Sequence, residues 1–170
     1  MTTPFHAKYW AQSLRLARHD GVDAISRSIG NARVDLNPHQ VDAALFALRS
    51  PYSKGVLLAD EVGLGKTIEA SLILAQKWAE RRRRILLVVP ATLRKQWQVE
   101  LEDKFFLPSI ILEARAANAL AKKGIENPFA VDDKIVICSY QFVFAKRDLV
   151  RQVNWDLVVV DEAHRLRSIY

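Results

Sequence analysis

A glycine-rich segment and an acidic pair carry the residue types that phosphate and metal chemistry require. Residues 59–67 read Ala-Asp-Glu-Val-Gly-Leu-Gly-Lys-Thr, and Asp161-Glu162-Ala163-His164 follows an apolar run. Main-chain amides in a loop that opens a helix point at one place and bind phosphate oxygens, assisted by the helix dipole. A carboxylate pair can hold Mg²⁺ and orient a water for attack on phosphorus. Together the two segments predict a site for ATP and Mg²⁺.

The glycine-rich loop sits between a predicted strand and a predicted helix, which favours nucleotide binding over a plain turn with a surface lysine. Lys66 is expected to reach the β- and γ-phosphates, and the Thr67 hydroxyl to bind magnesium. Asp60 stands where the general pattern has glycine, and aspartate tolerates unusual backbone angles better than most residues. The residues expected to contact the nucleotide in this loop are Gly63, Leu64, Gly65, Lys66 and Thr67.

The acidic pair ends the last predicted strand of the chain. We assign Asp161 to magnesium and Glu162 to the attacking water, so that the catalytic set is Lys66, Asp161 and Glu162. A charged strand end would be the ordinary interpretation if the phosphate loop were absent. His164 has two open interpretations, which are a link between nucleotide state and neighbouring elements, and a simple helix cap.

Composition restricts the class of protein. The 170 residues are half apolar, carry a net charge of +6 and have an isoelectric point near 9.6, which suits an acidic partner such as nucleic acid without requiring one. The lone Cys138 excludes an intramolecular disulfide and a cysteine-based zinc site, which favours a reducing, cytoplasmic location. No secretory signal and no apolar run of membrane-spanning length is present, so we expect no membrane partner.

The elements that must position these residues alternate between helical and strand patterns. Continuous apolar strands imply that helices cover both faces of a parallel sheet, so we expect an α/β, three-layer fold. A ligand in such a fold binds at the carboxyl ends of the strands. The expected strands are 56–59, 85–89, 110–112, 135–138 and 157–160. The expected helices are 5–18, 22–29, one opening at Asn37-Pro38 and ending at Pro51, 67–79, one with Leu93, Trp97 and Leu101 on one face, 116–122 and 142–150.

These motifs resemble those of superfamily-two helicases. More narrowly, Ala59 to Thr67 resembles the Swi/Snf-type DNA translocases, whose loop has aspartate where the general pattern has glycine. Bacterial members include an ATPase that recycles RNA polymerase and helicase-like proteins of phage-defence systems. The resemblance covers Leu36 to the C-terminus and implies a RecA-like, P-loop NTPase lobe.

The resemblance also implies further site residues. Gln40, in Leu36-Asn37-Pro38-His39-Gln40, is similar to the family's Q motif, and its amide could read the adenine edge; an exposed helix glutamine is the alternative. The segment Val89-Pro90-Ala91-Thr92-Leu93, followed by Gln96-Trp97, is similar to motif Ia, and Cys138-Ser139-Tyr140 falls where motif Ib would lie. The weak candidates for nucleic-acid contact are therefore Pro90, Thr92, Ser139 and Tyr140, with a helix cap at Thr92 and a core position for Tyr140 as alternatives.

Other conspicuous residues have structural interpretations. The basic run Arg81–Arg84 follows a helix at the end that points away from the expected site, so we interpret it as a solvated helix terminus rather than a nucleic-acid patch. Trp97 and Trp155 lie in apolar contexts and are expected in the core.

The expected domain organisation is a helical lead-in at 1–35 and a partial first RecA-like lobe at 36–170. The resemblance implies a second RecA-like lobe, in a missing part of the chain or on a partner, and a further strand between the loop strand and the Asp161 strand. Because such a strand would fill the sheet centre, we expect the lobe to be incomplete at its C-terminus and the isolated chain to bind and hydrolyse ATP poorly.

The function implied is the ATP-binding part of a motor that moves on double-stranded DNA, with RNA polymerase or a defence complex as candidate partners. One alternative is a strand-separating DEAH-type helicase of a restriction or defence system. Another, of a different class, is a non-catalytic nucleic-acid-binding fragment.

Overall fold

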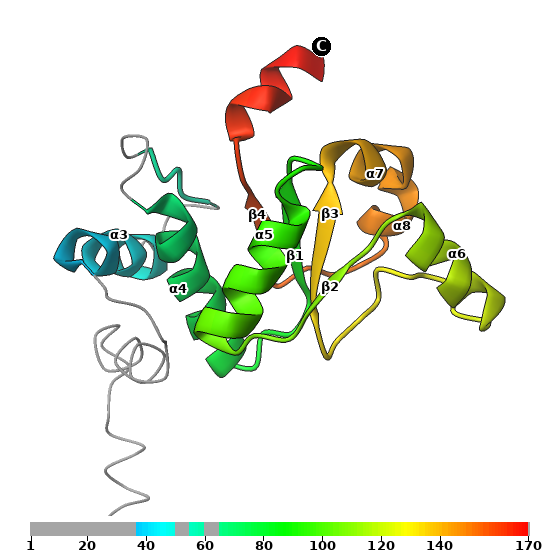
Figure 1. Ribbon diagram of the computed structural model, residues 1–170, viewed down its shortest axis with the longest axis horizontal. Coiled ribbons are helices and arrows are strands. Elements are labelled where there is room, and N and C mark those ends of the chain that lie inside the picture. The colour runs from blue at the N-terminus through cyan, green and yellow to red at the C-terminus, as the bar shows by residue number, and fades with distance from the viewer. Residues whose placement is uncertain (1–36, 50–54, 60–64, 170) are drawn as a thin grey trace, which may run out of the picture.

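Four parallel strands form the centre of the computed structural model, which describes residues 37–49, 55–59 and 65–169 (Figure 1). The strands are β1 (Ile85–Val89), β2 (Ser109–Ile111), β3 (Ile135–Ser139) and β4 (Leu157–Val160). They lie in the order β2-β3-β1-β4, and every neighbouring pair is parallel. The sheet therefore has the parallel arrangement that the continuous apolar strands predict.

Alternate residues of the strands face two separate hydrophobic clusters. On one side, Leu87 of β1 and Ile137 of β3 pack with Leu72 and Leu74 of helix α4 (Lys66–Ala79). On the other, Val88 and Val136 pack with Phe129, which is fully buried. Because successive side chains of a strand point to opposite faces, these two clusters are the two interfaces of a three-layer fold.

Helices cover both faces of the sheet (Figure 1). Helices α3, α4 and α5 lie on one side, and α6, α7 and α8 lie on the other. Their bounds are α3 Pro38–Arg49, α4 Lys66–Ala79, α5 Arg94–Val99, α6 Ala114–Lys122, α7 Tyr140–Ala145 and α8 Arg147–Arg151. A π-helical turn (η1), Glu100–Lys104, extends α5, and a 3₁₀ segment (η2), Ala163–Ile169, follows β4. The expected α/β, three-layer architecture is confirmed.

Helix α3 begins where the sequence predicts, with Asn37 before it and Pro38 at its first position. The Gln40 amide accepts a hydrogen bond from the Asn37 backbone N–H at 3.2 Å, which is half of a capping box. Ala44 is fully buried, and Val41, Leu45 and Leu48 pack against the same cluster. These four apolar residues therefore form the face of α3 that packs on the core.

The predicted strand 56–59 is wrong. Residues 55–59 have no strand structure, and the Leu57 residue is 77% exposed. A strand is held by hydrogen bonds to a neighbour, so apolar composition alone does not place a segment in a sheet. Strand β4, which pairs only with β1, is an edge strand of the sheet as described, and 47% of Val158 is exposed. Among the described residues no strand lies beyond β4, where the family resemblance implies a further one.

The predicted helix 142–150 is two shorter helices, α7 and α8, which meet at Lys146. Lys146 leaves the helical conformation with φ −114° and ψ 21°, which ends the first helix. Phe142 and Val143 before the break, and Leu149 and Val150 after it, all pack on the same cluster. The predicted helices 5–18 and 22–29 lie outside the described residues.

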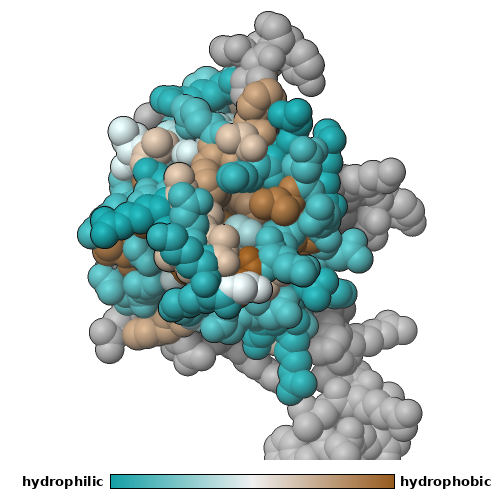
Figure 2. Space-filling model, turned by 90° about the vertical axis from the view of Figure 1, so that its right-hand side faces the viewer, coloured by the Kyte–Doolittle hydropathy of each residue, from teal (hydrophilic) through white to brown (hydrophobic). Residues whose placement is uncertain are grey.

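The side of the molecule that carries α6, α7 and α8 is mostly hydrophilic, with hydrophobic side chains confined to small patches (Figure 2). Phe144 of α7 is one of the exposed hydrophobic residues, with 59% of its surface accessible. No helix in the described part of the chain is long and apolar enough to cross a membrane.

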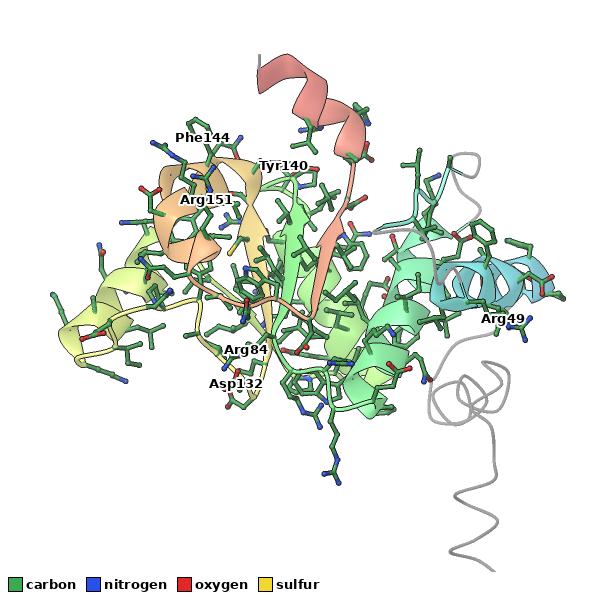
Figure 3. The ribbon with its side chains drawn as sticks, turned by 180° about the vertical axis from the view of Figure 1, so that it is seen from behind. Arg49, Arg84, Asp132, Tyr140, Phe144 and Arg151 are labelled. Atoms are coloured by element: carbon green, nitrogen blue, oxygen red, sulfur yellow. The ribbon has the colours of Figure 1, made fainter. Side chains whose placement is uncertain are left out.

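The basic run Arg81–Arg84 lies between α4 and β1, at the amino ends of the strands. Three of its members are exposed, and Arg84 pairs with Asp132 at 3.0 Å. Figure 3 shows Arg84 and Asp132 at the opposite end of the sheet from Tyr140, which follows β3. The interpretation as a solvated helix terminus, away from the carboxyl ends of the strands, fits this position.

Candidate nucleotide and nucleic-acid site

The phosphate-loop candidates lie at the start of α4. Gly65 precedes the helix with φ 92°, a left-handed conformation that favours glycine, and Lys66 and Thr67 form the first turn. Both side chains are half-buried. Gly63 and Leu64 lie outside the described residues. The described half of the loop therefore has the glycine-to-helix geometry that aims main-chain amides at an anion.

Gln40 lies against this turn. It is only 5% exposed, so it is not the exposed helix glutamine that the sequence left open. A Cβ placed on Gly65 would come within 2.2 Å of Gln40 Nε2. Helix α3 packs along α4, with Val41 and Ile68 against the same cluster. The structure therefore brings the Q-motif candidate and the phosphate-loop candidate together, although they are 25 positions apart.

Asp161 is held from three directions at the carboxyl end of β4. Its backbone N–H donates to the carbonyl of Val88 at 2.9 Å, which extends the β1–β4 ladder by one residue. The Tyr140 hydroxyl donates to its backbone carbonyl. The Trp97 indole N–H donates to its carboxylate Oδ2 at 2.8 Å. A half-buried carboxylate with this support has a defined position.

Glu162 and His164 follow Asp161 in a more open setting. Glu162 has φ 54°, an uncommon conformation for a residue with a side chain and one that is concentrated at functional sites. Its Oε2 lies 3.2 Å from His164 Nδ1, and their side chains are 44% and 68% exposed. The His164 side chain is therefore directed at Glu162.

The donor chemistry at Asp161 fits magnesium. Mg²⁺ prefers hard oxygen ligands, and it is commonly bound through one or two carboxylates together with substrate phosphates. In the described part of the chain no three His, Cys, Asp or Glu side chains gather into a metal cluster. Asp161 together with the Thr67 hydroxyl and nucleotide phosphates would be a donor set of the expected kind.

Two of the four nucleic-acid candidates line one hollow. Pro90 and Tyr140 border a hollow of about 350 Å³, together with Ala91, Gln141, Phe144 and Arg165. Figure 3 shows Tyr140 and Phe144 at the same end of the sheet. Burial and the nearby Asp161 carboxylate raise the pKa of Tyr140, so its hydroxyl keeps the proton that it donates. This hollow combines an arginine, an exposed aromatic ring and a hydroxyl.

The other two candidates have different settings. Thr92 is exposed in the turn that precedes α5. Ser139 is buried, and its hydroxyl accepts a hydrogen bond from the Phe142 backbone N–H at 3.2 Å, which caps α7. Ser139 thus has a structural partner, while Thr92 is open to a ligand.

Sequence reasoning missed three residues of this region. Trp97 is in the core as expected, at 3% exposure, but its indole N–H reaches Asp161, and the apolar helix pattern gave no sign of that bond. Phe144 and Arg165 line the hollow beside Tyr140. A signal for Trp97 did exist, because a buried indole N–H requires an acceptor.

The candidate residues gather at one side of the fold. Figure 1 shows the first turn of α4 and the carboxyl ends of β1, β3 and β4 at the same edge of the sheet. Lys66 is the first residue of α4 and Asp161 directly follows β4, so both belong to this edge. The arrangement is that of a parallel α/β sheet with its ligand edge at the strand ends.

Comparison with known proteins gives consistent matches. The model of a family described as "SNF2-related domain" matches residues 38–169. Among solved structures, the chain is similar to the Sulfolobus solfataricus SWI2/SNF2 ATPase core in complex with double-stranded DNA, with a TM-score of 0.66 and 23% sequence identity. That match covers 81% of this chain and 28% of the other, so the chain spans less than a third of the length of that structure's chain.

Proposed function

Because the chain belongs to the SNF2-related domain family, we propose that it is the ATP-binding part of a motor that couples ATP hydrolysis to movement on double-stranded DNA. Residues 36–170 form part of the first RecA-like lobe, and a second lobe completes the motor. The observation that carries this proposal is the common edge formed by the first turn of α4 and the Asp161–Glu162 pair. The similar solved structure is a complex with double-stranded DNA, which supports the choice of partner.

The residues of this edge divide the chemistry. Main-chain amides from Gly63 to Thr67 bind the phosphates, and Lys66 neutralises charge on the β- and γ-phosphates. Asp161 and Thr67 would hold Mg²⁺, and the bound ion would supply positive charge next to the phosphate oxygens. Glu162 orients the attacking water, and Gln40 contacts the adenine.

The hollow beside Tyr140 is the proposed nucleic-acid contact. Arg165 can pair with a phosphate, and the Tyr140 ring can stack on a sugar. The exposed Thr92, which follows Ala91 of the hollow in sequence, supplies a further hydroxyl. Such contacts fix the position of a protein on the duplex without reading its sequence. They suit a motor that must move along DNA regardless of base order.

The test is the substitution Glu162→Gln in the full-length natural protein. The amide keeps the size of the side chain and removes the negative charge, so we expect DNA-stimulated ATP hydrolysis to fall at least about a hundredfold while ATP still binds. His164→Gln is the matched control, because it changes the side chain that contacts Glu162 and leaves the Glu162 carboxylate itself in place. A variant that retains its hydrolysis rate would remove the catalytic role of Glu162 and favour the non-catalytic nucleic-acid-binding alternative.

The enzyme alternative is a strand-separating DEAH-type helicase. Displacement of a triplex-forming strand measures translocation on duplex DNA, and displacement of a strand from a forked duplex measures unwinding. The proposed motor gives the first signal with ATP and lacks the second. Unwinding of the forked substrate would assign the chain to the alternative.

A further inference from the structure

Trp97 combines a rigid setting with an unusual acceptor. Its side chain lies on α5 at 3% exposure, within the cluster that includes Leu87, Val89 and Leu101. Its indole N–H donates to Asp161 Oδ2 at 2.8 Å. The ring cannot turn without opening the core, because close-packed interiors leave little room for another rotamer. The direction of the N–H is therefore fixed by packing.

Trp155, which is partly buried, shows what an indole does when it only needs an acceptor. Its Nε1 donates to the backbone carbonyl of Val150 at 3.0 Å, five residues away in the same part of the chain. It packs on the opposite cluster, with Phe142 and Leu149. Trp97 instead reaches 64 residues along the chain to a carboxylate. The two tryptophans thus form a matched pair that differs in the acceptor.

A hydrogen bond to one carboxylate oxygen limits rotation of the whole group. Asp161 is already fixed through its backbone N–H, bonded to Val88, and through its carbonyl, bonded by Tyr140. The bond from Trp97 also fixes the side chain of Asp161 and occupies its Oδ2 atom. Partners of this kind hold metal-binding carboxylates in the orientation that the metal requires.

We propose that Trp97 is a positioning residue for Asp161, and that its indole N–H holds one carboxylate oxygen so that the other is presented to the magnesium of a bound nucleotide. This inference rests on the proposed function, because it assumes that Asp161 binds Mg²⁺. Trp97 itself touches neither the nucleotide nor the metal. Its contribution is the orientation of a ligand.

The test is Trp97→Phe in the full-length natural protein, with binding of a fluorescent ATP analogue titrated against Mg²⁺. Phenylalanine keeps an aromatic ring in the core and removes the N–H. We expect the Mg²⁺ concentration at half-maximal enhancement of nucleotide binding to rise about tenfold, since loss of such a partner lowers metal affinity by about 10–100-fold. Binding of the analogue in EDTA should stay within about twofold of the wild type.

Trp155→Phe is the control, because it removes an indole N–H of the same kind from a site that does not contact Asp161. Its Mg²⁺ midpoint should equal that of the wild type. In an Asp161→Asn background, Trp97→Phe should cause no additional shift. A folded Trp97→Phe variant with the wild-type midpoint, or one that loses binding equally with and without Mg²⁺, would overturn the inference.

A second measurement requires no substitution at Trp97. Protein labelled with 5-fluorotryptophan reports each indole by ¹⁹F NMR, and we expect the Trp97 signal to move when Mg²⁺ is added to the nucleotide complex while the Trp155 signal stays in place. Equal behaviour of the two signals contradicts the positioning role. If the unsubstituted protein shows no Mg²⁺-dependent nucleotide binding at all, it is the proposed function that fails.

Discussion

Gln40 packs so closely on Gly65 that any side chain at Gly65 would displace it. An added Cβ would lie 2.2 Å from Gln40 Nε2, and Gly65 has φ +92°. Glycine is therefore required at position 65 for two separate reasons. The chain makes a left-handed turn before α4, and Gln40 fills the space that a side chain would occupy. The contact connects the first turn of α3 to the first turn of α4. An adenine group read by Gln40 and phosphates bound at Gly65 would belong to one nucleotide.

Gly65→Ala tests this contact, and Gly124→Ala is its matched control. Gly124 also has a positive φ, +82°, but nothing lies within 4 Å of an added Cβ. Both variants should lose about 1 kcal/mol of stability from backbone strain. Only Gly65→Ala should also weaken nucleotide binding, by at least about tenfold, because Gln40 must move. Chemical denaturation and ATP-analogue titration measure the two effects, and an equal effect of both variants on nucleotide affinity would contradict the argument.

The sheet was predictable because its strands are continuous apolar runs. Ile85–Val89 and Ile135–Ser139 are buried along their whole length, and burial on both faces leaves no alternation to misinterpret. Asn37-Pro38 likewise marks the start of α3 through local chemistry alone. These features depend on neighbours in sequence or on a continuous apolar composition, and both can be seen in the sequence itself.

The errors arise where structure depends on a distant partner. Residues 56–59 have the composition of a strand, but hydrogen bonds from a neighbouring strand decide whether one forms. The bond from Trp97 to Asp161 crosses 64 positions, and nothing in the apolar spacing of α5 indicates it. The burial of Gln40 is of the same kind, since it follows from how α3 packs on α4.

Arg165 should contribute to DNA binding through the hollow that it lines with Tyr140. We expect Arg165→Ala to weaken binding of duplex DNA and to reduce the slope of log affinity against log salt by about 1, as for the loss of one phosphate contact. Arg115→Ala is the control, because Arg115 is exposed on α6 and does not line this hollow. Fluorescence anisotropy at several salt concentrations gives both slopes, and identical slopes for the two variants would remove Arg165 from the interface.

Cys138 should be chemically silent in the folded protein. Its side chain is fully buried in β3, and burial raises the pKa of the thiol to about 12. The thiolate is the reactive form, so alkylation at pH 8 requires unfolding first. Mass spectrometry of the peptide that contains Cys138 should show less than about a tenth of the iodoacetamide labelling in buffer that it shows in urea. Rapid labelling without denaturant would mean that β3 is accessible in the native state.

Asp156 fastens the amino ends of β1 and β4 together. Its carboxylate accepts hydrogen bonds from the backbone N–H groups of Arg84 and Arg83, both at 3.1 Å, and its Oδ1 lies 3.4 Å from Arg82 Nη1. The hydrogen bond from the Arg84 N–H is the largest cause that holds the pKa of Asp156 below its ordinary value of 3.8. The Arg83 N–H and the Arg82 side chain lower this pKa further. A carboxyl group whose pKa is lower in the folded state stabilises the fold above its unfolded pKa. That contribution is lost as the pH falls through the folded pKa.

Asp156→Asn should therefore lower the free energy of unfolding by about 1 kcal/mol at pH 7, because two hydrogen bonds lose their charged acceptor at a partly exposed site. The difference from the wild type should begin to shrink as the pH falls below about 4, the pKa of the unfolded state, and should vanish below the lower pKa of the folded state, where the wild-type carboxyl group also becomes neutral. Asp132→Asn is the control, since Asp132 makes one bond to Arg84 at 3.0 Å and its side chain is 64% exposed, against 26% for Asp156. Urea denaturation at pH 7 and at low pH measures all three proteins. A difference for Asp156→Asn that persists unchanged at low pH would show that shape, and not charge, links the two strands.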